Sequence, residues 1–164
     1  MSWWESAVQQ ARRLARRHGV AQLTSFYEGR FPAHLPRDQR EPVIRPGRFG
    51  FIMERAFLQH VGHGGLLERT VELLATSLVS GGIFYSLMIA REGASGHWGI
   101  TRWSEREIRA AVEPWFTIRE MRRDVFTPGE PGSVPAWITV MSPRLASAPP
   151  MTYYGPSDLR EELS

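Results

Sequence analysis

The chain of 164 residues contains neither cysteine nor lysine. The absence of cysteine excludes disulfides, thiolate zinc ligands and thiol nucleophiles, and it fits a reducing compartment. The absence of lysine excludes a Schiff-base amine and a Walker-type phosphate lysine, so all 20 basic residues are arginines. No apolar run approaches the roughly 18 residues of a membrane span, and the first residues do not read as a signal peptide. These absences predict a soluble, cytoplasmic protein.

The composition that remains is that of one globular domain. Hydrophobic residues make up 42% of the chain and charged residues 23%, enough for a core and too few charges for global disorder. The formal charge is +3 and the isoelectric point is about 9.9. The arginines are scattered apart from short clusters at 12–17 and 122–123, which favours solvated helix faces over a nucleic-acid patch. A basic nucleic-acid binder stays open as a reading that needs a salt-dependent affinity.

Hydrophobic periodicity predicts an α/β fold. Apolar residues at helical spacing predict helices over 5–18, ending at Gly19, and over 66–79, ending at the Gly81-Gly82 pair. Ser104 followed by Glu107 predicts a capping box that opens a third helix through Val112. Short apolar or β-rich runs predict strands at 23–27, 49–53, 83–90, 116–126 and 136–141. The last two strands are expected to form an antiparallel hairpin at the edge of a mostly parallel sheet.

Several segments, in order, resemble class I S-adenosylmethionine-dependent methyltransferases. The segment AVQQARRLARRHGV looks like the second helix of that family, LTSFYEGRFPAHLP like its third strand and GRFGFIMERAFLQHV like its fourth strand and active-site loop. LLERTVELLATSLVSGGIFYSLMIA is similar to the next helix and fifth strand, and the two late strands look like the sixth and seventh. The loop GASGHWGITRWS leans toward the thiopurine and tellurite-resistance branch. The resemblance implies an incomplete Rossmann-like fold, without the first two strands and the glycine-rich loop.

What the resemblance implies for cofactor binding follows the strand ends, because ligands of open α/β sheets bind beyond the carboxyl ends of the strands. The cofactor expected is S-adenosylmethionine. After the third strand, Arg30 stands where the family has an acceptor for the adenine amino group, and Phe31 is positioned to cover an adenine face. After the fourth strand the loop 54–60 would lie against the methionine and the transferred methyl. The implied cofactor-binding residues are Arg30, Phe31, Glu54, Arg55, Ala56 and Phe57.

The individual residues of that loop leave alternatives open. Glu54 reads either as a carboxylate held near the ligand or as an ion-pair partner of an arginine, and Phe57 either as core or as a substrate platform. His60 is the candidate catalytic residue, as a base or hydrogen bonder on the substrate side. Pairing of His60 with His63 as metal ligands is disfavoured without a cysteine or carboxylate partner. Trp98 and Trp103 either flank a substrate lid or anchor a glycine-rich loop to the core.

The expected organisation is a partial methyltransferase domain over 1–142 and a flexible tail over 143–164. Without the first two strands of the family, the strand at 49–53 would present an unpaired apolar edge. Either the strand at 23–27 moves in beside it, another chain or a second copy covers it, or the protein is poorly soluble. The expected function is methyl transfer to a small-molecule acceptor. The alternative is a methyltransferase-like relic or interaction module that has lost the cofactor.

Overall fold

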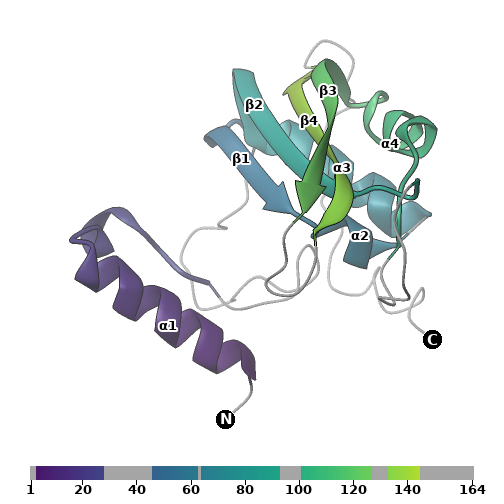
Figure 1. The fold of residues 1–164 in the computed structure, drawn as a ribbon. Coiled ribbons are helices and arrows are strands. Elements are labelled where there is room, and N and C mark those ends of the chain that lie inside the picture. The colour runs from purple at the N-terminus through teal and green to yellow at the C-terminus, as the bar shows by residue number, and fades with distance from the viewer. Residues whose placement is uncertain (1–2, 28–45, 63, 93–100, 127–132, 145–164) are drawn as a thin grey trace. The chain divides into compact units, whose positions relative to one another are not determined.

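The computed structural model describes residues 3–27, 46–62, 64–92, 101–126 and 133–144 (Figure 1). The chain divides into two compact units: Met1–Val43 with Tyr153–Ser164, and Ile44–Thr152. Among the helices of the described residues, none is long and apolar enough to cross a membrane.

The described part of the first unit begins with helix α1, Trp3–Arg17. Gly19 ends the helix in the left-handed conformation, with φ of 69°. The amide of Val20 donates to the Ala15 carbonyl at 2.9 Å, and the amide of Gly19 donates to Arg16 at 3.1 Å, which is a Schellman cap. Arg16 and Arg17 in the last turn also suit the negative end of the helix dipole. The expected helix and its glycine stop are confirmed.

The strand predicted at 23–27 is wrong. Ala21–Leu23 form a short 3-10 helix, η1, and no strand is assigned over 24–27. Side chains hold this turn locally: the Gln22 amide donates to the Gly19 carbonyl at 3.2 Å and the Thr24 hydroxyl to the Val20 carbonyl at 3.0 Å. Such local bonds offer the backbone an alternative to a sheet ladder, and β-propensity alone did not reveal them.

The second unit is built on a four-stranded sheet in the order β1-β2-β4-β3. Its strands are β1 (Phe49–Arg55), β2 (Leu78–Ile89), β3 (Phe116–Phe126) and β4 (Val134–Pro143). β1 and β2 lie side by side and parallel, as expected for 49–53 and 83–90. The β3–β4 hairpin is antiparallel, as expected, and β4 also pairs antiparallel with β2. The sheet is therefore mixed, which corrects the expectation of a mostly parallel sheet: the hairpin joins through β4, and 23–27 adds no parallel strand.

The start of β2 departs from the expected helix–turn–strand. The strand begins at Leu78, directly after α3, and the glycine pair lies inside it. Phe49 pairs with Leu78 but Phe51 pairs with Ile83, so β2 bulges between these positions. Gly81 has φ of 75°, and a Cβ on Gly82 would lie 2.9 Å from the Val79 carbonyl oxygen. Both glycines are therefore required by the bulge rather than by a helix end.

Three helices accompany this sheet: α2 (Leu58–Val61), α3 (Gly65–Ser77) and α4 (Glu105–Val112). The short α2 was not expected, whereas α3 confirms the amphipathic helix, with Leu67, Val71 and Leu74 buried. Ser104 caps α4 in the expected capping box with Glu107. The Ser104 hydroxyl and amide, and then Arg91, hold the pKa of Glu107 at about 2. Figure 1 shows α3 passing behind the sheet and α2 below it.

The two faces of the sheet differ in what covers them. Phe84 and Phe116 pack on the face that carries the helices, with ring centroids 5.2 Å apart. The opposite face carries a second cluster, formed by Leu87, Ala136 and Ile138 with Tyr85, Phe126 and Val140 packed against them. Farther out on that opposite face, on β1, Phe51 is 57% exposed and Met53 is 63% exposed. The sheet is thus well buried at its centre and apolar but open at β1.

Candidate functional site

The candidate site is the rim formed where the strands end. β1, β2 and β3 run in the same direction, so their last residues, Arg55, Ile89 and Phe126, lie at the same end of the sheet as the start of β4. The arrowheads of β1 and β3 in Figure 1 point toward this end. Ligands of open α/β sheets bind at such carboxyl ends. Chain order and strand direction therefore place the loop 54–60 where the sequence analysis expected it.

Glu54 organises the loop that follows β1. Its side chain is only 7% exposed. The carboxylate oxygen Oε2 accepts from the amide of Phe57 at 2.7 Å and from the amide of Leu58 at 3.3 Å, while Oε1 accepts from the Ser86 hydroxyl. Burial raises the pKa of Glu54 above its ordinary value, and these hydrogen bonds oppose that shift. The carboxylate thus fixes the turn into α2, which is a role neither alternative for Glu54 had named.

Glu54 is the first member of a buried polar row. Glu54 pairs with Ser86 across β1 and β2, and Ser86 pairs with Thr139 across β2 and β4. Ser86 and Thr139 are both completely buried. Paired residues share a face of the sheet, so the row lies on the face that α2 covers. The Thr139 hydroxyl has no hydrogen-bond partner among the described residues, which leaves a buried polar atom in the middle of β4.

Gln59 ties three segments of the rim together. This side chain of α2 is 2% exposed. Its Oε1 accepts from the amide of Ile89 at 2.7 Å, and its Nε2 donates to the carbonyl of Thr101 at 2.8 Å. No role for Gln59 was predicted from the sequence. The available signal was an amide side chain within the apolar stretch FLQHV, because a polar residue buried there needs partners of its own.

Trp103 anchors the segment that returns from the loop after β2. Its side chain is 1% exposed, and the residue forms a parallel bridge with Ala90. The Trp103 amide donates to Ile89 at 3.1 Å, and the Arg91 amide donates to Trp103 at 3.0 Å. Of the two readings for Trp103, the structure supports the anchor. Trp98 lies outside the described residues.

The other candidate residues of the loop differ in exposure. Ala56 is buried, takes a positive φ of 63° and donates its amide to Leu87 at 2.8 Å. That conformation costs a non-glycine residue of the order of 1–2 kcal/mol, so the contacts of Glu54 and Gln59 must hold the turn against strain. Phe57 is half-buried and His60 is exposed. The Arg55 guanidinium lies over the Phe126 ring, 4.3 Å from its centroid.

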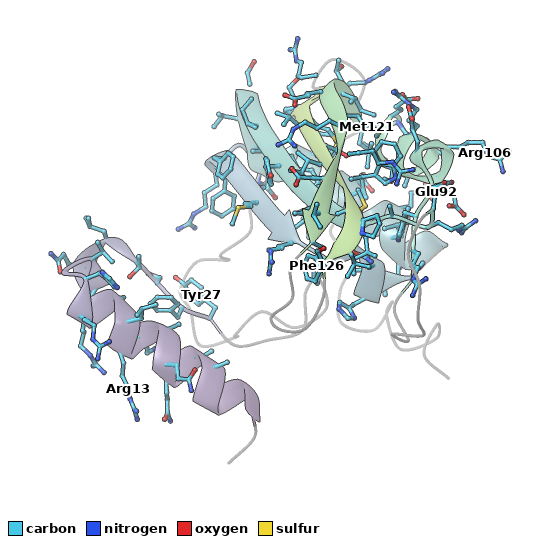
Figure 2. The ribbon with its side chains drawn as sticks, in the orientation of Figure 1. Arg13, Tyr27, Glu92, Arg106, Met121 and Phe126 are labelled. Carbon is cyan, nitrogen blue, oxygen red and sulfur yellow. The ribbon has the colours of Figure 1, made fainter. Side chains whose placement is uncertain are left out.

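Charged pairs line the same end of the sheet. Arg91 pairs with Glu107 at 2.5 Å and Arg123 with Glu92 at 3.0 Å. The Arg123 guanidinium also stacks on Trp137, 3.9 Å from its ring centroid. Figure 2 labels Phe126 near the tip of β3. These pairs fix the segments flanking the rim, although each is exposed enough to contribute little to stability.

The remaining expectations fall elsewhere. Arg30, Phe31 and His63 lie outside the described residues, so the adenine contacts and the two-histidine arrangement stay untested. Among the described residues there is no cluster of three or more metal-binding side chains. A groove between α3 and α4 is lined by Leu67, Glu68, Trp103 and Trp115, among others, and includes neither Phe57 nor His60. The strand ends, rather than this groove, therefore remain the candidate site.

Comparison with known proteins gives the fold and no closer relationship. No protein-family model and no curated protein sequence matches the chain. Among solved structures, a SAM-dependent methyltransferase from Methanosarcina mazei aligns with a TM-score of 0.62 and 14% identity, over 83% of this chain and 76% of its own. A Pyrococcus horikoshii protein aligns with a TM-score of 0.57 and 13% identity, over 85% and 68%. A Haloferax volcanii complex of the Trm112 methyltransferase activator with a methyltransferase gives 0.50 and 17%, over 76% and 66%. The chain has the α/β fold of SAM-dependent methyltransferases.

Proposed function

We propose that this chain transfers a methyl group from S-adenosylmethionine to a small-molecule acceptor. The observation that carries the proposal is the sheet: parallel β1 and β2, then the reversed hairpin through β4, with the loop 54–60 beyond the end of β1. The same fold serves the methyltransferase from Methanosarcina mazei. Because a shared fold alone does not assign an activity, the proposal depends on whether the residues at the strand ends suit the cofactor.

The described residues fit one side of such a cofactor. Phe57 offers a half-buried ring and His60 an exposed imidazole, both in the turn that Glu54 and Gln59 hold in place. A turn fixed by buried hydrogen bonds provides the preorganised surface that a binding site needs. The described residues contain no counterpart of the glycine-rich turn or of the ribose-binding acid that the resemblance implies. The proposal therefore assigns the loop 54–60 to the methionine side of the site.

Methyl transfer from a sulfonium needs little acid–base catalysis. The sulfonium of the bound cofactor supplies an electrophilic methyl, and alignment with the acceptor in a water-poor site supplies much of the acceleration. Residues that set geometry therefore matter more than a catalytic dyad. Here these are Glu54 and Gln59, which act through the backbone of Phe57, Leu58 and Ile89. His60 is assigned to the acceptor side, as a hydrogen bonder.

Calorimetric titration with S-adenosylhomocysteine, the demethylated product, tests the proposal. We expect binding with a dissociation constant of ~1 μM–1 mM, the range of ordinary enzyme substrates. Phe57→Ala should weaken binding by about fivefold, because it removes an aromatic contact worth of the order of 1 kcal/mol. Phe51→Ala is the matched control, since it makes the same change in the middle of β1 and away from the rim.

The titration has two outcomes that decide whether this chain binds the cofactor at the loop 54–60. Binding that Phe57→Ala weakens and Phe51→Ala leaves unchanged supports the assignment. If the titration gives no heat of binding, and the ligand at millimolar concentration does not stabilise the folded chain against unfolding, cofactor binding by this chain is refuted. If the cofactor binds, a panel of small molecules is screened for methylation to identify an acceptor. His60→Ala should then bind that acceptor more weakly than the wild type, because His60 is assigned to the acceptor side of the site.

The second candidate is an interaction module with the methyltransferase fold. The open, apolar β1 favours it, because a monomeric enzyme would gain nothing from exposing Phe51 and Met53 on an edge strand. Absence of ligand binding together with stable association through β1 would favour this candidate.

A further inference from the structure

The two edges of the sheet are built differently. β3 forms one edge and carries Arg119, Glu120, Arg122, Arg123 and Asp124. Arg122 pairs with both Glu120 and Asp124 along that strand. Charged side chains of this kind discourage another strand from pairing. The β3 edge is therefore protected.

The β1 edge lacks this protection. Its sequence is Phe-Gly-Phe-Ile-Met-Glu-Arg, and its first charged residue, Glu54, is buried and engaged with the loop. Phe51 and Met53 are more than half exposed. A Cβ added to Gly50 would meet nothing within 4 Å, so a neighbouring backbone could approach there. Among the described residues, no strand pairs with this side of β1.

The direction of the free backbone groups follows from the pairing with β2. The amide of Ala56 donates to Leu87 on β2. Backbone groups alternate in direction along a strand, so the even-numbered residues of β1 point toward β2 and Phe51, Met53 and Arg55 point outward. The side chains of these odd-numbered residues also share the face of the sheet opposite α2 and α3, where Phe51 and Met53 are exposed.

We propose that β1 pairs antiparallel with β1 of a second copy of this chain, joining the two sheets into one. With Ile52 opposite Ile52 of the second copy, Phe51 lies opposite Met53 and Phe49 opposite Arg55. Every residue with outward backbone groups then lies opposite another such residue, so backbone hydrogen bonds can form between the copies along the whole length of β1. The same register makes a two-fold symmetric contact, the commonest arrangement of soluble homo-oligomers.

Self-complementarity is what selects a second copy as the occupant. The antiparallel register opposes Phe51 with Met53 on the open face, an aromatic–thioether pair, and brings the Arg55 guanidinium to the Phe49 ring. It places no like charges opposite one another. A parallel, in-register pair would instead oppose Arg55 with Arg55, which is unfavourable. The inference does not depend on the proposed function, since it concerns a strand edge and not the rim.

Light scattering after size exclusion, over a dilution series, tests the proposal. We expect a mass of twice 18.7 kDa for the chain, falling to 18.7 kDa on dilution. Met53→Pro removes the outward amide of residue 53 from both copies of the symmetric contact, and the proline ring blocks the strand edge. The dimer dissociation constant should therefore rise by at least about 30-fold. Since that amide does not face β2, the fold should survive; Met53→Lys is the second variant, and circular dichroism checks both.

The matched control is Val125→Lys, which alters an exposed apolar residue on the other edge strand. It should leave the dimer unchanged. Residue-level hydrogen exchange supplies an independent readout: the amides of Phe51 and Met53 should be protected in the dimer and lose protection on dilution. A monomer at every concentration would overturn the proposal. So would a dimer that folded Met53→Pro and Met53→Lys variants retain, or one that Val125→Lys dissociates.

Discussion

Replacing Gln59 by leucine removes the side chain that joins α2, the end of β2 and the segment before Trp103. Leucine is of similar size, so the change tests hydrogen bonding more than volume. It leaves the amide of Ile89 and the carbonyl of Thr101 without the partners they have at 2.7 Å and 2.8 Å. Because Gln59 is 2% exposed, water has little access to replace it.

The expected cost follows from these two groups. Each buried polar group left without a partner costs about 1–3 kcal/mol. Better burial of the new methyl groups returns about 1 kcal/mol. The expected loss is therefore about 1–5 kcal/mol, compared with the ~5–15 kcal/mol that stabilises a typical domain. For a unit of roughly 100 residues, such as Ile44–Thr152, at about 4 °C per kcal/mol this lowers Tm by about 4–20 °C.

Urea and thermal unfolding followed by circular dichroism measure this loss. His60→Leu is the matched control: it places the same new residue at the next, exposed position of α2 and should change stability by no more than ~0.5 kcal/mol. The reasoning is refuted if Gln59→Leu is as stable as the wild type, or if both variants lose the same stability.

Two further predictions concern Glu54 and the glycines of the strands. Burial raises the pKa of Glu54 above 4.5, so its contribution to stability is full below pH 4.5 and is lost as pH rises through the folded pKa. Glu54→Gln keeps an acceptor for the Phe57 and Leu58 amides but does not ionise, so its stability relative to the wild type should increase as the pH rises from 4.5 to neutrality. Urea unfolding midpoints measure this, and a stability difference that does not change with pH would contradict the raised pKa of Glu54. Gly82→Ala should lower the free energy of unfolding by about 1–3 kcal/mol, because the new Cβ would meet the Val79 carbonyl oxygen. Gly50→Ala places its Cβ in open space and should not destabilise the protein. Equal changes in Tm for the two variants would contradict the close approach at the β2 bulge.

Periodicity and capping located most of the second unit from sequence. The amphipathic pattern of 66–79 and the Ser104–Glu107 box report local physics, so α3 and α4 appear close to where they were expected. The parallel neighbours β1 and β2 were also correct, since short apolar runs joined by a helix have few alternative arrangements. By contrast, 23–27 has strand-like composition, but bonds from Gln22 and Thr24 and the lack of a pairing partner among the described residues decide its structure.

The sequence predicted where the loop 54–60 lies in the fold and missed the contacts that hold it. The loop 54–60 follows β1 as expected, because strand ends are readable from the sequence. The roles of Glu54 and Gln59 depend on backbone groups of Leu58, Ile89 and Thr101, which no spacing rule brings to them. The polar row through Ser86 to Thr139 likewise exists only once the register of three strands is fixed.

The central claim is that the end of the sheet beyond β1 and β2 receives the cofactor. Amide chemical shifts recorded during titration with S-adenosylhomocysteine test it most directly. The account predicts that the largest changes map to the loop from Ala56 to His60 and to the residues after Ile89, with the start of β1 and the β2 bulge unmoved. Saturable changes confined to the α3–α4 groove, or none at all, would contradict it.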